Sequence, residues 1–446
     1  MGLFRNAASV LLTSVVSIPI GVATSVILAR YLSLDDRGYF AVASAISGAI
    51  VVLAQLGWPS AVIYRLRRTG AAPADAATAA FLAVLVFSAL AVGACLLLQE
   101  QVATWFLKGA PLGVLYLALA TAPVMLLGIV LSAIARGLDR FAMQNWYRFV
   151  LNSGRLAALA LVLVVAGGGL LEALGANLAV YAVCAIGLAV AVVRRTGIRL
   201  RANTREFVET LKFGSKTWTH AVAANVHERV GLFMLAFLLQ DPAEVAVYAI
   251  AAGVVEYLRF LPESVGAGAL PQMAGLDRSR SGTLISSALR HAMLWIALAL
   301  LVAVPCGPFV IPFMYGSAYA GSVAPFLVLA SAMLFKTPYL LIRLHFLAMD
   351  RQGINIGIQL FSMPLNLLLN LWLIPRWGIL GAATASLISH GFEAVAAGAI
   401  FLRSSDIGVR ELLVFRRSDL DPYRVRLRGA LSRLRSSGGS GGAPPS

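Results

Sequence analysis

Charged side chains inside long apolar runs are the residues of this sequence best placed to do chemistry. The densest group is His227-Glu228-Arg229. Glu256 and Arg259 follow three residues apart, which places them on one face of a helix. An ionisable side chain at the centre of a bilayer costs about 2.5–3.5 kcal/mol on insertion scales, so each of these residues needs a compensating interaction or a function.

Arginine in such a position points to the recognition of a phosphate or pyrophosphate. Its planar guanidinium donates two parallel hydrogen bonds to oxyanions and stays charged at any physiological pH. The candidates for binding an anionic substrate are the polar side chains within or at the ends of the apolar runs: Arg30, Gln55, Arg229 and Arg259.

The carboxylates allow two interpretations. Glu228 and Glu256 could take up a proton or a cation, because a low dielectric raises the pKa of a carboxyl. Alternatively they form ion pairs inside the membrane. The pairs that the sequence suggests are Glu256 with Arg259, Glu228 with Arg229 or a neighbour, and Lys336 with Glu393.

The sequence shows no catalytic or metal-binding constellation. Cys95, Cys184 and Cys306 all lie inside apolar stretches and lack the spacing of a disulfide or zinc framework. A Gly-rich phosphate loop, a nucleotide-binding domain and a nucleophile elbow are also missing. We therefore expect no catalytic residues, no metal and no cofactor, and we expect that the protein is not an enzyme.

Composition then defines the environment of these residues. Of 446 residues, 59% are hydrophobic and only 13% are charged, where soluble domains carry about 25% charged residues. Too little polar surface remains to cover a globule in water, so the chain is expected to be an all-α polytopic membrane protein. The net charge of +16 does not indicate a nucleic-acid partner, because the arginines lie between apolar runs rather than on one soluble face.

Twelve apolar runs are long enough to cross a hydrocarbon core, which needs roughly 20 residues. They cover residues 7–29, 39–64, 78–98, 112–135, 149–167, 170–193, 217–239, 244–270, 288–311, 322–348, 354–374 and 378–402.

The basic residues predict the orientation of these spans. Most arginines and lysines fall in alternate loops, including the cluster between residues 194 and 216, whereas the opposite loops hold only Arg30, Arg37, Lys108 and Arg376. Because basic loops stay inside, both termini are expected on the cytoplasmic side of the membrane.

The basic loop divides the spans into two groups of six, and the two groups resemble each other. Residues 28–41 correspond to residues 235–249, and residues 135–141 correspond to residues 346–352. Both groups start inside, so the repeats are parallel and related by an axis along the membrane normal. We therefore expect two pseudo-symmetric six-helix lobes around a central cavity. The predicted units are an N-terminal lobe (1–200), a C-terminal lobe (201–402) and a basic cytoplasmic tail (403–446) that is partly disordered.

Several stretches resemble one family of exporters. Ile374-Pro375-Arg376-Trp377-Gly378 followed by Gly381-Ala382-Ala383 is similar to the signature before the last helix of polysaccharide exporters, and Leu365–Asn370 is similar to their Asn-bearing helix. Leu28-Ala29-Arg30-Tyr31-Leu32 with Asp35–Ala41 resembles the segment that leads into their second span. Glu228-Arg229 replaces their usual Asp-Arg, and Leu261–Met273 resembles the end of their eighth span.

On these motifs the chain is identified as resembling the oligosaccharide flippases of the multidrug/oligosaccharidyl-lipid/polysaccharide exporter superfamily. The resemblance implies a V-shaped fold in the bacterial inner membrane, which moves a polyprenyl-pyrophosphate-linked oligosaccharide from the inner to the outer leaflet by alternating access. It also implies membrane lipids, a polysaccharide polymerase and chain-length proteins as partners. The cavity would be lined by spans one, two, seven and eight, near Arg30, Glu228, Arg229, Glu256 and Arg259.

Two other functions remain open at this stage. A cation-coupled multidrug exporter of the same superfamily would have an acidic cavity rather than one rich in arginine. A membrane enzyme such as a polysaccharide polymerase or ligase would need a long external loop, and the longest candidate covers only residues 99–111.

Overall fold

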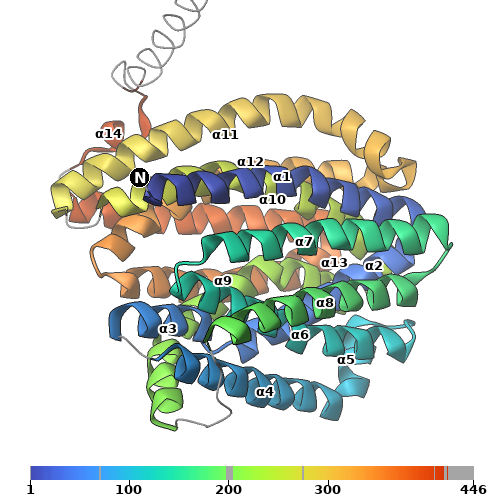
Figure 1. Cartoon of the computed structure of the whole chain (residues 1–446). Helices are drawn as coiled ribbons and strands as arrows, with labels where there is room; N and C mark the ends of the chain where they lie inside the picture. Colours follow the sequence, from blue (N-terminus) through green and yellow to red (C-terminus); the bar gives the residue numbers. More distant parts are fainter. Residues whose placement is uncertain are drawn as a thin grey trace, which may run out of the picture.

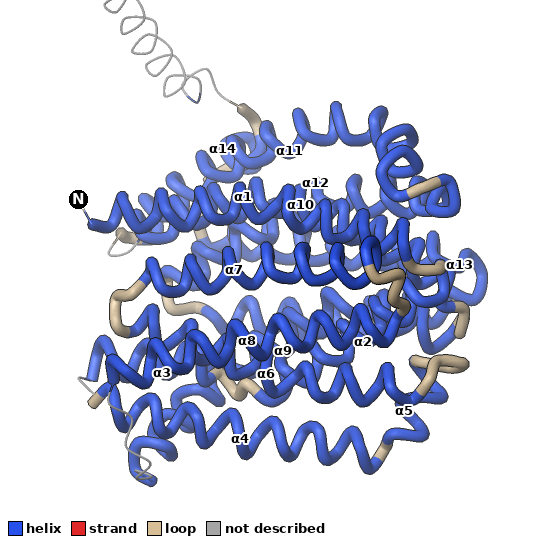
Figure 2. The backbone as a smooth tube through the Cα atoms, turned by 45° about the vertical axis from the view of Figure 1, so that its right-hand side comes forward, coloured by secondary structure: helices blue, strands red, loops and turns tan. Residues whose placement is uncertain are grey.

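The computed structural model describes residues 2–69, 72–196, 204–273, 276–405, 407–415 and 419. Long helices dominate these ranges and lie side by side (Figure 1). Short loops join them at the two ends of the molecule (Figure 2).

The first half of the chain forms the helices α1 (Gly2–Tyr31), α2 (Leu34–Ala54), α3 (Trp58–Tyr64), α4 (Pro73–Leu97), α5 (Gln99–Phe106), α6 (Leu112–Gly137), α7 (Phe141–Leu159) and α8 (Leu170–Thr196), with π-helical turns η1 (Arg65–Thr69) and η2 (Ala160–Val165). The second half forms α9 (Thr204–Leu238), α10 (Pro242–Met273), α11 (Arg278–Tyr315), the 3₁₀ turn η3 (Ser317–Ser322), α12 (Val323–Ala348), α13 (Gln352–Ser404) and α14 (Val409–Leu413).

The helices have the length and composition of membrane spans. Within the described ranges, nine helical stretches are long and apolar enough to cross a bilayer, and residues 17–31 of α1 form a shorter apolar segment. Each predicted apolar run falls on a helix, so the expected all-α polytopic fold is confirmed. The number of twelve spans and their division into two lobes stay predictions.

Three boundaries differ from the prediction. The second predicted span, 39–64, is broken into α2 and α3 at Leu56 and Gly57, which both have positive φ. The last two predicted spans are continuous in α13 and are separated only by a non-helical residue, Gly378 (φ 55°, ψ −133°). The predicted basic loop ends earlier than expected, because α9 already begins at Thr204.

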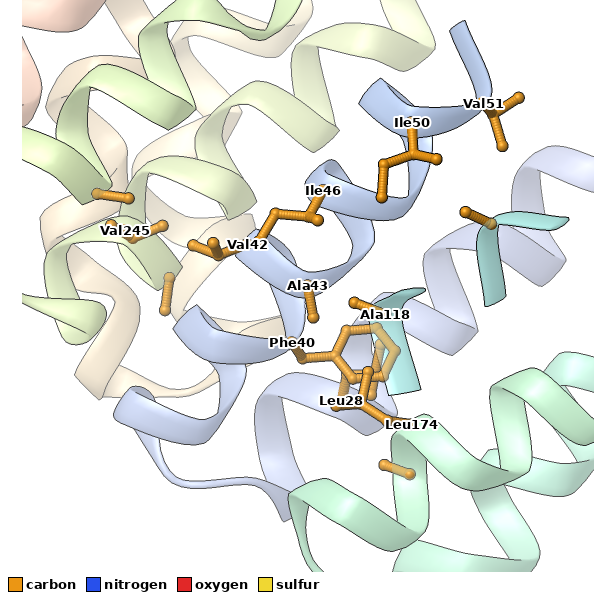
Figure 3. Close-up of a cluster of buried hydrophobic side chains, with 14 of the residues drawn as sticks. Leu28, Phe40, Val42, Ala43, Ile46, Ile50, Val51, Ala118, Leu174 and Val245 are labelled. Atoms are coloured by element: carbon orange, nitrogen blue, oxygen red, sulfur yellow. The ribbon is translucent and has the colours of Figure 1, made fainter. Parts of the chain in front are cut away.

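Helix α2 is the most deeply buried of the candidate spans and contacts helices from both halves of the chain. Ser33 begins it: its hydroxyl accepts a hydrogen bond from the backbone N–H of Asp36. Figure 3 shows Phe40 beside residues of α1, α6 and α8, and Val42 beside Val245 of α10. Helix α2 thus connects both halves of the chain through one apolar core.

The two halves of the chain contain the same turn, at positions that correspond to each other in the internal sequence repeat. Asp139, between α6 and α7, and Asp350, between α12 and α13, have φ of 57° and 56°. The N–H of Arg140 donates to the carbonyl of Ala135 at 2.8 Å, and the N–H of Arg351 donates to that of Phe346 at 2.8 Å. The same backbone at paired positions supports the proposed internal repeat.

Helix α9 joins the two halves. At its start, the ring of Phe207 lies 5.2 Å from that of Trp58, and the ring of Phe213 stacks on Tyr64 at 4.2 Å. Arg65 donates to Glu206, and this hydrogen bond raises the pKa of the Arg65 guanidinium. Further along, α9 lies against α13. The helix therefore packs on α3 at its start and on both α5 and α13 further along.

The start of the basic tail is attached to α11. Buried Arg290 binds both carboxylate oxygens of Asp419, at 2.7 and 2.9 Å, and also donates to the backbone carbonyl of Glu411. The ring of His291 lies 3.1 Å from the carbonyl of Asp419. A bidentate arginine–carboxylate pair with both side chains buried is among the stronger polar contacts in proteins.

Replacing Arg290 with alanine should release this segment. We expect limited proteolysis to cut near residues 405–419 at least tenfold faster, because buried Asp419 loses the charge that compensates it. Arg280→Ala is the matched control, since Arg280 is exposed and lies 3.8 Å from Asp277. Equal cleavage of the two variants would show that the ion pair does not hold the tail.

Candidate functional site

Arg259 of α10 is the centre of an ionic cluster. Its Nη1 lies 2.6 Å from Glu228 of α9 and 3.1 Å from Glu256, and its Nε lies 2.9 Å from Glu263. Lys336 of α12 lies 3.5 Å from the same oxygen of Glu228. The suggested pairing of Glu256 with Arg259 is confirmed, and the neighbour of Glu228 is Arg259 rather than Arg229.

This cluster faces a cavity of about 430 Å³ between α1, α7 and α10. Ser17 of α1, Arg148 of α7 and Ser264 of α10 add further polar groups to its wall. The side chains of Glu256 and Glu263 are 55% and 45% exposed, so water reaches the cluster. Two cations face three carboxylates there, which leaves the cluster with one net negative charge when all five groups are ionised.

Arg229 points away from this cluster. It lines a separate cavity of about 230 Å³, which is otherwise apolar and lies between α2, α9 and α13. Its guanidinium lies against Gly48 of α2: a Cβ on that glycine would be 3.0 Å from the arginine Cζ. The structure therefore separates Arg229 from Arg259, although the sequence suggested that they act together. Asn225 and His227, on the same helix, have side chains outside the described part of the structure.

Arg30 lies at one end of the bundle and outside the cavities described above. Its Nε donates to the carbonyl of Met314 at 2.8 Å, and its Nη2 donates to the carbonyl of Phe313. These carbonyls belong to the last turn of α11, whose partial negative charge favours a cation. Arg30 thus joins the end of α1 to the end of α11, a role that the apolar pattern of the sequence did not indicate.

Close contacts between the two halves continue at this end, which we call the Arg30 end. The Lys108 amine donates to the side chain of Gln240 in the second half at 2.8 Å, while its backbone carbonyl accepts a hydrogen bond from the hydroxyl of Tyr39 in the first half at 2.8 Å. Gly38 of α2 lies directly against α10, because a Cβ there would be only 1.9 Å from the carbonyl oxygen of Pro242. The backbones of α2 and α10 meet here without any intervening side chain.

Gln55, the remaining predicted site residue, is the last residue before the break between α2 and α3. Its backbone carbonyl accepts a hydrogen bond from the N–H of Trp58 at 2.8 Å, and its side chain is half-buried. It lines none of the three cavities described in this section. The structure thus places it at a bend of the chain rather than deep in a continuous span.

A second polar cavity, of about 270 Å³, lies between α1, α2 and α7 and reaches Ala249 of α10. Arg37 and Arg155 both line it, together with Asn152 and Thr24. The sequence analysis placed Arg37 in an external loop because the second span was predicted to begin at residue 39, yet its side chain is only 8% exposed. Arg37 is the residue that reasoning from sequence missed.

The suggested pairing of Lys336 with Glu393 is wrong as stated. Lys336 lies next to Glu228, whereas Glu393 of α13 is buried and accepts its contact from His390, at 3.0 Å. The i, i+3 spacing of His390 and Glu393 was the available signal for this pair.

Comparison with known proteins identifies the family. Residues 3–274 match the family model described as polysaccharide biosynthesis protein. Because this match covers more than half of the chain, the protein belongs to the polysaccharide biosynthesis protein family. No curated protein sequence matches the chain.

Solved structures show the same fold at low sequence identity. The lipid II flippase MurJ in an inward closed conformation is 14% identical, with a TM-score of 0.73 over 90% of this chain and 88% of that one. A multidrug resistance MATE transporter of the MOP superfamily in an inward-facing conformation is 15% identical, with a TM-score of 0.64 over 87% and 93%. A MOP superfamily transporter from Pyrococcus furiosus is 13% identical, with a TM-score of 0.59 over 90% and 95%.

The fold and the family together define the class of this protein. It is a multi-pass membrane protein of the polysaccharide biosynthesis family, with the fold seen in the lipid II flippase MurJ and in MATE transporters.

Proposed function

We propose that the protein is an alternating-access flippase for a polyprenyl-pyrophosphate-linked oligosaccharide, such as an O-antigen or exopolysaccharide precursor. The observation that carries this proposal is a pair of polar cavities between α1, α7 and α10, in a chain of the polysaccharide biosynthesis family. Hydroxyl, amide and charged groups in a watery cavity suit a sugar chain, while the prenyl tail remains in the surrounding lipid.

The direction of transport follows from the predicted orientation in a bacterial inner membrane. With both termini in the cytoplasm, the Arg30 end faces the periplasm. The contacts of Arg30, Gly38 and Lys108 then close the periplasmic side, and the larger cavity opens toward the cytoplasm. Rocking of two six-helix lobes in a twelve-span fold would reverse this arrangement.

A cation-coupled multidrug exporter is the second candidate, and one observation favours it. Glu256 and Glu263 line the larger cavity, where exposed carboxylates could bind a cationic drug. The family match supports the flippase instead, because it connects the chain to polysaccharide rather than to drugs. A polysaccharide polymerase and chain-length proteins would be the expected functional partners.

Deletion of the gene separates the two candidates. For a flippase we expect loss of the surface polysaccharide and accumulation of its lipid-linked precursor, both reversed by the wild-type chain, with unchanged sensitivity to cationic drugs. Lipid-linked sugars are extracted and quantified by mass spectrometry. Normal surface polysaccharide with drug hypersensitivity would refute the flippase and support the exporter.

A further inference from the structure

Arg37 is a buried cation without a counter-ion in the described part of the chain. It is the fourth residue of α2 and its side chain is 8% exposed. Its Nε has no hydrogen-bond partner, and no carboxylate within the described ranges forms an ion pair with it. The phenols of Tyr315 and Tyr319 lie near enough to act on its charge, and both are neutral at physiological pH. Since a guanidinium cannot lose its proton in a protein, the positive charge remains.

The cavity that Arg37 lines contains a second arginine. Arg155 of α7 donates through Nε to Asn177 at 2.7 Å, and its guanidinium lies 5.5 Å from the centre of the Tyr181 ring. Both of these partners are neutral. No Asp or Glu belongs to the residues that line this cavity, whereas Glu256 and Glu263 line the larger one. The two cavities on either side of Tyr257 therefore differ in charge.

The internal repeat shows that the fold does not need an arginine at this position. Ser33 and Asp241 each cap the following helix through a side-chain oxygen. The N–H of Arg37 donates to the Ser33 carbonyl at 2.9 Å, and that of Val245 donates to the Asp241 carbonyl at 3.3 Å. Val245 is thus the counterpart of Arg37, and it is only 1% exposed. An apolar residue fills the equivalent site and packs there.

A buried, unpaired charge is unfavourable for folding, so its presence calls for a ligand that compensates it. We propose that the cavity of Arg37 and Arg155 binds the phosphate or pyrophosphate group of the cargo. This inference rests on the proposed flippase function. At about 270 Å³ the cavity lies just below the range of about 300–1,000 Å³ that encloses a whole drug-sized ligand, so it fits a headgroup rather than the oligosaccharide.

Arg37 and Arg259 then have different roles. Arg37 and Arg155 offer positive charge without competing carboxylates, and they hold the anion. Arg259 is already bound to three glutamates and neutralises the wall of the larger cavity, where the sugars lie. Thr24, Ser25 and Asn152 add hydrogen-bonding groups to the anion cavity.

Binding of a soluble prenyl pyrophosphate tests the assignment. Isothermal titration of the purified full chain in neutral detergent, with farnesyl pyrophosphate, should show binding that Arg37→Gln weakens at least tenfold. Arg37→Lys should weaken it about threefold, because lysine keeps the charge but loses the planar fork. Arg376→Gln is the matched control, since Arg376 is exposed and lies over Trp372, and it should bind as the wild type does.

The affinities for inorganic pyrophosphate and for farnesol show whether the anion in the cavity belongs to a lipid or is free in solution. Weaker binding of inorganic pyrophosphate than of farnesyl pyrophosphate, with no binding of farnesol, supports a lipid-linked cargo. Equally tight binding of inorganic pyrophosphate would assign the cavity to a free anion and overturn the proposal. Unchanged affinity in Arg37→Gln would overturn it as well.

Thermal stability separates ligand binding from a structural role. Without ligand, Arg37→Gln should unfold at the same temperature as the wild type or a few degrees higher, because the uncompensated charge is gone. A lower unfolding temperature with intact binding would show that Arg37 is structural, which contradicts the proposal. If the wild type binds no pyrophosphate ester while the deletion strain still accumulates lipid-linked precursor, this inference fails and the flippase function stands.

Discussion

Replacing Arg259 with alanine is expected to reduce export at least tenfold. The change leaves Glu228, Glu256 and Glu263 with Lys336 as their remaining cation in the cluster, so the cavity wall repels an anionic cargo. Removing one partner of a fully buried pair costs about 3–5 kcal/mol. Because these carboxylates are 39–55% exposed, we expect a loss of about 1–2 kcal/mol in the free energy of unfolding. Surface polysaccharide in the complemented deletion strain, and thermal unfolding of the purified variant, measure the two effects.

A second substitution distinguishes charge balance from direct contact with the cargo. Glu228→Gln combined with Arg259→Ala restores the net charge of the cluster, so we expect stability to return and export to recover to within about threefold of the wild type. If the double variant folds as well as the wild type and still exports nothing, Arg259 itself contacts the cargo. If Arg259→Ala alone exports normally, the cluster has no part in transport.

Replacing Gly38 with valine is expected to block the transport cycle. The backbone carbonyl of Pro242 occupies the space that a Cβ would need, and a carbonyl in a helix cannot move aside as a flexible side chain can. We therefore expect the contacts at the Arg30 end to separate and export to fall at least tenfold. Introducing Ser25→Cys, which lies in the anion cavity, into a background without native cysteines reports on this change. An impermeant maleimide added from the periplasmic side should label it faster when Gly38 is valine.

Gly93→Val in α4 is the matched control, because no atom lies within 4 Å of a Cβ at that position. The change from glycine to valine alters helix propensity equally at residues 38 and 93. Gly93→Val should nevertheless leave both the labelling of Ser25→Cys and export unchanged. Normal export by Gly38→Val would mean that the close approach of α2 and α10 is not needed in the cycle, and slow labelling of Ser25→Cys would mean that this end stays closed.

The sequence predicts the elements of this fold better than the directions of its side chains. Apolar runs of about 20 residues have one stable solution in a bilayer, so the predicted spans fall on helices. The break at Leu56 and Gly57 escaped prediction because the hydrophobic character continues across it. Gly57 and Pro59 were the local signals, and only a positive φ at two successive residues shows that the helix ends there.

The candidate site was predicted less well, for a physical reason. Glu256 and Arg259 form a pair because three residues along one helix bring any such side chains together. Arg229 and Arg259 lie on different helices, and the rotation of each helix about its axis decides that they face different cavities. Arg37 was assigned to a loop because the second span was predicted to begin at residue 39, whereas the cap at Ser33 starts α2 early enough to bury it.

The packing of α9 affects how the two halves of the chain can move relative to each other. Its first turns contact α3 through stacked rings and lie beside the Arg65–Glu206 pair, and its later turns contact α5 of the first half as well as α13 of the second. Movement of the two halves relative to each other would therefore be taken up along this one helix, because its side chains pack against both. Long helices accommodate such changes by curving gently along their length. A change in the curvature of α9 would accompany any rocking of the halves.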